Sequence, residues 1–116
     1  MVSENLKLIV KGNEYVMKFP TVGKIVEIDV QKSILSSGQY SILSTMGMET
    51  SAMALDKIDM QAVFNVLCPD LMKDLNVSNF DDLQIEDFNE LRKIYNDKVV
   101  PWYLGVIDLI REAYKK

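Results

Sequence analysis

Two short stretches near the start of the chain alternate apolar with polar residues, the pattern of β-strands that bury one face. The alternating apolar and aromatic positions are Leu6, Leu8, Val10, Tyr15, Met17 and Phe19. Between them, Gly12-Asn13 has the residue types that tight hairpin turns favour, and Pro20 ends the second stretch because it cannot donate to a strand ladder. The sequence therefore predicts a β-hairpin over residues 6–19. An isolated hairpin is marginal in water, so it must pack against another element.

Residues 21–38 carry a mixed pattern. The alternation of Val26, Ile28 and Val30 is typical of a strand, whereas Val22, Ile25, Ile28 and Leu35 fit one face of a helix. Thr21 is suited to cap a helix at its start, and Ser37-Gly38 to end one. We favour the helix.

Helical spacing continues through most of the remaining chain. A short helix is expected after Gln39, ending near Gly47, and a longer one over 51–68, with Ser51 as its cap and Pro69 ending it. Residues 70–84 are turn-rich, with one or two helical turns. From about Ile85 to the end, one long helix is expected, with a main apolar stripe of Phe88, Leu91, Tyr95, Val99, Trp102, Val106 and Leu109.

These elements predict a single domain over residues 1–116, of the α+β class and mainly α. The hairpin, 6–19, should pack on a bundle of about four helices, 21–116. Pro101 removes one helical hydrogen bond and clashes with the preceding turn, so the long C-terminal helix should be kinked at Pro101.

Composition narrows the classes of function. With 48% hydrophobic and 26% charged residues, the chain has the make-up of a soluble globular domain. Its net charge of −4 and its lack of a Lys/Arg stripe argue against nucleic-acid and anionic-membrane partners. There is no histidine, the commonest catalytic base and nitrogen metal ligand, and a single cysteine, Cys68, which cannot form an intramolecular disulfide. We therefore expect a non-enzymatic, cytoplasmic protein without metal or cofactor, and without a signal peptide or membrane span.

Two groups of residues could form binding sites, one for calcium and one for a helical ligand, but a structural role explains each of them more simply. Asp74, Asn76, Ser78 and Asp82 follow the ligand spacing of a calcium-binding loop, but Asn79 replaces its glycine and Ile85 its closing glutamate. Helix-start charges and solvated turns explain these acids better. The methionines Met46, Met48, Met53 and Met60 could line a groove for helical ligands, although filling gaps in the core is the favoured interpretation.

The segment KVVPWYLGVI, residues 98–107, is apolar on almost every side. Beyond Pro101 the apolar arc spans about 220° of the helix, whereas a surface helix needs little more than 100°. The helix could be buried within its own chain, or its second arc could bind another molecule. We favour the second interpretation, with a partner-binding surface formed by Val100, Trp102, Tyr103, Leu104 and Ile107.

Taken in order, three segments resemble the small tail assembly chaperones of tailed bacteriophages. They are KGNEYVMKFPTVGKIVEIDVQKSILSSGQY, ALDKIDMQAVFNVLCPDL and DFNELRKIYNDKVVPWY. The resemblance lies in the Gly-Asn hairpin, the apolar helix ending in Cys-Pro, the acidic turn and the long last helix. It implies a non-enzymatic protein of the host bacterial cytoplasm that self-associates. Such a protein binds apolar helices of a tape measure protein while the tail is assembled.

Two other classes of protein remain open from the residues themselves. A small structural protein of the virion, such as a connector or tail completion protein, would expose the same surface but stay in the particle. A small enzyme, or an acidic inhibitor or adaptor, would be monomeric. The inhibitor would need its acids along one face, whereas here they bunch near 70–90.

Overall fold

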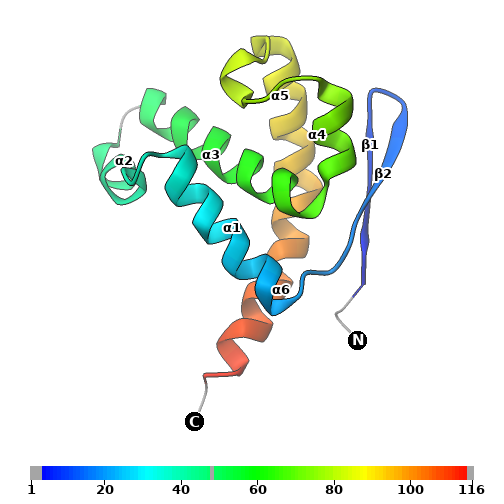
Figure 1. Ribbon diagram of the computed structural model, residues 1–116, viewed down its shortest axis with the longest axis vertical. Coiled ribbons are helices and arrows are strands. Elements are labelled where there is room, and N and C mark those ends of the chain that lie inside the picture. Colours follow the sequence, from blue (N-terminus) through cyan, green and yellow to red (C-terminus); the bar gives the residue numbers. More distant parts are fainter. Residues whose placement is uncertain (1–3, 48, 115–116) are drawn as a thin grey trace.

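The computed structural model describes residues 4–47 and 49–114, and its architecture is α+β and mainly α, as predicted (Figure 1). The elements in chain order are β1 (Leu6–Val10), β2 (Asn13–Met17), α1 (Val22–Leu35), α2 (Tyr40–Met46), α3 (Glu49–Leu67), α4 (Pro69–Leu75), the 3-10 turn η1 (Phe80–Asp82), α5 (Ile85–Ile94), the π-helical turn η2 (Tyr95–Val99) and α6 (Val100–Glu112). The last three form one continuous helical segment. No helix in these two ranges is long and apolar enough to cross a membrane.

The N-terminal hairpin pairs β1 with β2 antiparallel, with Val10 opposite Asn13 at the closed end. The turn residues are Lys11 and Gly12, whose φ angles are 50° and 81°. Two positive φ angles are the requirement of a two-residue type I′ turn. The predicted turn at Gly12-Asn13 is therefore wrong by one residue, because Asn13 already pairs as the first residue of β2.

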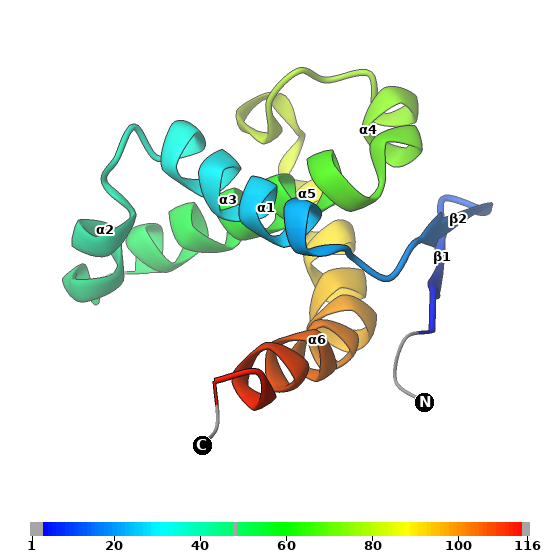
Figure 2. The same ribbon diagram turned by 60° about the horizontal axis from the view of Figure 1, so that its bottom comes forward.

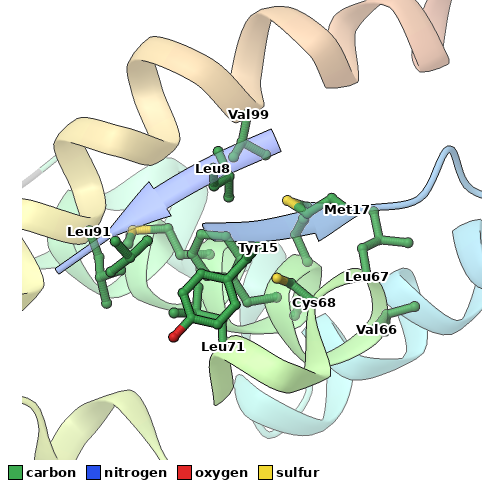
Figure 3. Close-up of a cluster of buried hydrophobic side chains, with 14 of the residues drawn as sticks. Leu8, Tyr15, Met17, Val66, Leu67, Cys68, Leu71, Leu91 and Val99 are labelled. Carbon is green, nitrogen blue, oxygen red and sulfur yellow. The ribbon is translucent and has the colours of Figure 1, made fainter. Parts of the chain in front are cut away.

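One face of the hairpin is buried against the helices, which confirms that it packs on them. Leu8, Val10, Tyr15 and Met17 all lie in the core. Figure 3 shows Tyr15 and Met17 beside Cys68 and Leu71, at the junction of α3 and α4. The Tyr15 hydroxyl donates a hydrogen bond of 2.6 Å to Asp74 at the far end of α4. The opposite face of the hairpin, with Ile9, is exposed.

Helix α3 runs through the middle of the molecule. Its buried side chains include Met60, Val63 and Phe64. The Phe64 ring lies 6.3 Å from that of Phe80 in η1 and 5.8 Å from that of Tyr95 in η2, so one side chain joins three elements. Helices α1 and α2 both contact α3, and α1 lies across it in Figure 2.

The helix boundaries follow most of the local signals in the sequence. The Thr21 hydroxyl accepts a hydrogen bond of 3.4 Å from the Lys24 N–H, which confirms the predicted cap and the helical interpretation of 21–38. Gly47, with φ of 69°, ends α2 as predicted. Ser51 does not cap α3, because the helix already begins at Glu49 and Ser51 lies buried within its first turns. Pro69 ends α3 and at once begins α4.

The C-terminal helical segment is kinked next to Pro101, as predicted, and the irregular part lies on its N-terminal side. In η2 the Val100 N–H donates to the carbonyl of Tyr95, five residues back rather than four. A proline ring crowds the turn before it and has no N–H for the Asp97 carbonyl. The wider π turn gives that ring room and changes the direction of the axis before α6 starts.

Candidate protein-binding surface

The five residues predicted to bind a partner all lie on α6, but they differ in exposure. Leu104 is exposed at 55% of its full area, whereas Val100, Trp102, Tyr103 and Ile107 are half-buried. On a helix of 100° per residue, Val100, Leu104 and Ile107 share one edge, and Trp102 points to the other side of the buried face. The five therefore do not form one continuous exposed patch.

Trp102 has contacts within its own chain. Its indole N–H donates a hydrogen bond of 2.8 Å to the carbonyl of Glu4, which precedes β1. Its ring meets Phe19 edge to face, with centroids 6.0 Å apart and planes at 89°. The side chain thus joins α6 to the two chain segments that flank the open end of the hairpin, which is a structural role.

Tyr103 is half-buried against the core. Burial raises the pKa of Tyr103, and the negative charge of Asp29 on α1 adds to the rise. Its ring packs against the core cluster. Together with Trp102 it fixes α6 to the rest of the fold. Leu104 is exposed on the edge of α6 that it shares with the half-buried Val100 and Ile107.

A larger apolar surface lies farther along α6. An open groove of about 390 Å³ runs between the first turns of α1, the β2–α1 connection and the last turns of α6. Every residue that lines it is apolar or aromatic: Phe19, Pro20, Val22, Ile25, Val26, Val106, Leu109, Ile110, Ala113 and Tyr114. None of the five predicted residues is among them, although Val106 and Leu109 belong to the predicted main stripe.

The outer face of α1 carries a second apolar feature. Val22, Val26, Val30 and Ile34 follow one another every four residues and are exposed at 80%, 56%, 50% and 63% of their full areas. We call these four residues the α1 ridge. The inner face of the same helix packs on α3 through Ile28, which is fully buried. Helix α1 is therefore apolar on two opposite faces, and only one of them is covered by the chain.

Sequence reasoning missed the ridge, although the sequence contained a signal of it. The same alternation of Val26, Ile28 and Val30 that made a strand plausible is the mark of a helix with apolar residues on both sides. A one-sided amphipathic helix would have had polar residues at two of these three positions. The pattern looked mixed because α1 carries apolar residues on its exposed face as well as on its buried face.

The predicted methionine cluster divides between core and surface. Met60 is fully buried in the core, whereas Met46 and Met53 are exposed. Met53 lines an open groove of about 300 Å³ between α3 and α5, together with Phe80, Leu83, Ile85 and Phe88. Met48 lies outside the described residues. Core filling thus holds for Met60, and Met53 lies in a groove of its own.

Two polar residues of the loop compared with a calcium-binding loop, Asp74 and Asn79, make structural contacts. Asp74 accepts from Tyr15, and Asn79 caps η1 by accepting 2.8 Å from the Asp81 N–H. Across residues 4–47 and 49–114, no group of three or more acidic or cysteine side chains could hold a metal ion. Cys68 is buried, and burial raises the pKa of its thiol, which keeps it in the unreactive protonated form.

Comparisons of the chain with known protein families, with curated protein sequences and with solved structures found no match.

Proposed function

We propose that this protein is a non-enzymatic binding protein that captures an apolar helical segment of another protein. The observation that carries the proposal is the apolar groove between α1 and α6, lined by ten apolar or aromatic residues. A groove with helical walls and an apolar floor suits an amphipathic helix, which lays its apolar side chains into it at helical spacing.

The resemblance to tail assembly chaperones supplies a specific form of this proposal. In that form the partner is a tape measure protein, whose long apolar helices need a soluble cover until the tail tube surrounds them. The net charge of −4 supports it, because an acidic carrier resists aggregation when it holds apolar segments. Val100, Leu104 and Ile107 extend the proposed contact surface along α6, with Trp102 and Tyr103 holding the helix in place.

The proposal is tested with a labelled synthetic helix of about 20 residues that carries leucine at i, i+3, i+4 and i+7, followed by fluorescence anisotropy. The Leu109→Asp variant changes a groove residue that is already partly exposed. It should weaken binding at least about tenfold, the effect of some 1.4 kcal/mol. Leu104→Glu tests the edge of α6 in the same way.

The matched control is Ile9→Asp, which adds the same charge on the outer face of the hairpin and should leave binding unchanged. A scrambled peptide of the same composition, without helical spacing, should bind more weakly than the designed helix. If wild-type protein binds both peptides equally, the proposed capture of helices is wrong. A tape measure segment co-expressed with the protein then tests the specific form, through its solubility with and without the partner.

A further inference from the structure

The groove and the α1 ridge form one continuous apolar surface. Val22 and Val26 line the groove and are also the first two residues of the ridge. From Val26 the ridge continues to Val30 and Ile34, which are exposed and lie outside the groove. In Figures 1 and 2, α1 starts close to α6 and the two helices diverge from there. A helix seated in the groove can therefore continue along the outer face of α1.

The length of the ridge suits a single helix. From Val22 to Ile34 it spans about 18 Å, at a rise of about 1.5 Å per residue. Its residues are four apart, and a row of this kind fits between the side-chain rows of a second helix. A helix of about 20 residues is roughly 30 Å long, which exceeds the length of the ridge. One such helix can therefore cover the ridge and still reach into the groove.

Acidic residues border the exposed apolar arc of α1 on both sides. At 100° per residue, the arc runs over about 160° from Asp29 to Glu27 and contains no charged residue. Its residues are Val22, Gly23, Val26, Val30, Ser33 and Ile34. A helix that packs on this arc therefore has a carboxylate next to each side of its apolar stripe.

Asp29 is the less neutralised of these two carboxylates. It forms no ion pair with any residue that the structure describes, 4–47 and 49–114. Lys32, one turn farther along α1, pairs instead with Asp59 of α3 at 3.4 Å. Asp29 lies near α6, where its charge adds to the effect of burial in raising the pKa of Tyr103. An exposed carboxylate at this place favours a partner that supplies the cation.

The other charges on α1 and α6 do not reverse this preference. Glu27 forms a 3.7 Å pair with Lys24 within α1, but both side chains are half exposed, so the pair is weak. On α6, the charged residues nearest to the groove on the helical wheel are Arg111 and Glu112, one of each sign. Three carboxylates against two cations leave the border of the surface acidic.

We propose, on the premise of the helix capture proposed above, that the captured helix carries lysine or arginine on both sides of its apolar stripe. It runs from the groove along the α1 ridge, with its apolar side chains on Val22, Val26 and Val30. One flank lies beside Asp29 and the other beside Glu27, and these charge pairs fix the rotation of the helix about its own axis. Charge complementarity of this kind gives specificity and faster association more than it adds affinity.

Three synthetic helices of about 20 residues test the charge preference. They share one leucine stripe and carry lysine, glutamine or glutamate on both flanks, and fluorescence anisotropy with the wild-type chain gives each dissociation constant. At low ionic strength the lysine-flanked helix should bind about tenfold more tightly than the glutamate-flanked one. In about 1 M salt, where the screening length falls to roughly 3 Å, the difference should disappear.

A charge reversal separates this preference from a general loss of binding. The double variant Asp29→Lys, Glu27→Lys should reverse the order, so that the glutamate-flanked helix binds more tightly than the lysine-flanked one. Binding of the glutamine-flanked helix should change less than about twofold, because the apolar surface is unaltered. The matched control, Asp82→Lys with Glu90→Lys, changes the net charge equally outside the groove and should keep the wild-type order.

A pair of valines tests the path along the ridge. Val30→Gln changes a ridge residue outside the groove, and it should weaken binding of the glutamine-flanked helix about fivefold through lost apolar contact. Val16→Gln is the matched control, because Val16 on the outer face of the hairpin is exposed to a similar degree, 45% against 50%. Circular dichroism should show that both variants remain folded. Equal binding by the two variants would overturn the proposed path.

The possible results separate this proposal from the proposed function. If wild type binds the three helices equally, the flanking charges are wrong while helix capture stands. If a scrambled lysine-rich peptide binds as tightly as the lysine-flanked helix, the attraction is electrostatic alone and the proposal is overturned. If none of the three helices binds at about 500 μM protein, the proposed function is wrong and this proposal falls with it.

Discussion

Helices α1 and α3 are both apolar around most of their circumference, yet other elements cover α3 on most sides and α1 mainly on one. Helix α3 is enclosed by α1, α2, α4 and η1, and its Met60, Val63 and Phe64 have almost no exposed area. Helix α1 packs mainly on α3, on its inner side, and its ridge faces outward. Similar sequence patterns thus have different consequences, because the number of neighbours decides whether an apolar face becomes core or surface.

The largest expected difference in stability between the two helices appears when one apolar side chain is truncated on each. Phe64→Ala removes a fully buried ring in contact with Phe80 and Tyr95. It should lower the free energy of unfolding by about 3–5 kcal/mol, from lost burial and the cavity left behind. Val26→Ala, on the ridge, should change it by less than about 0.5 kcal/mol.

Urea denaturation measures both values. Equal losses in the two variants would contradict the comparison, because they would mean that the outer face of α1 is packed within its own chain.

A smaller effect on the free energy of unfolding is expected when one glutamine on each helix is replaced by leucine. Gln61 of α3 is buried, accepts a hydrogen bond of 3.0 Å from the Phe80 N–H and donates one of 3.4 Å to the Ser78 carbonyl. Gln61→Leu leaves that N–H without an acceptor and should cost about 1–3 kcal/mol.

Gln31 of α1 is the matched control. It is half-buried and accepts one hydrogen bond of 3.4 Å from Asn65. Water can replace that contact, so Gln31→Leu should cost less than about 0.5 kcal/mol in the same urea titration. A loss as large as that of Gln61→Leu would show that the α1–α3 contact is as closed to water as the far side of α3.

The smallest effect concerns pH and the tyrosines packed on α3. Burial raises the pKa of Tyr95 above its ordinary value of 10.0, and the negative charge of Asp59 on α3 adds to the rise. A raised pKa means that the unfolded chain loses this proton first as pH increases. The contribution of Tyr95 to stability is therefore complete below pH 10 and is lost progressively above it.

Between pH 10 and pH 11 this side chain should lower the free energy of unfolding by about 1 kcal/mol. Urea titrations of wild type and Tyr95→Phe across that range measure the difference, because the variant lacks the titrating group. Tyr114→Phe, at an exposed position on the last turn, is the control and should follow wild type. Parallel curves for all three proteins would show that Tyr95 is accessible to water.

The local elements could be predicted from the sequence because their causes are local. Alternating side chains define the hairpin, Thr21 begins α1, Gly47 ends α2, and Pro69 separates α3 from α4. The hairpin turn was misplaced by one residue because Lys11, unlike glycine or asparagine, gives no sign in the sequence that it adopts a positive φ.

The kink near Pro101 is also a local consequence, since a proline cannot complete a regular helix. Its exact form, a π turn over Tyr95–Val99, depends on the packing of Tyr95 against Phe64 and of Val99 in the core. The sequence indicates where the helix axis must bend. The side chains packed around Tyr95 and Val99 determine that the bend takes the form of a π turn.

The sequence by itself determined which faces of each helix are apolar, because side-chain direction follows from helix geometry alone. Only the tertiary structure decided which of these faces are covered. It turned Trp102 and Tyr103 toward their own chain, left Leu104 exposed, and placed the α1 ridge outside. The reason is physical: burial depends on neighbours distant in sequence, and a helical period contains no information about where those neighbours lie.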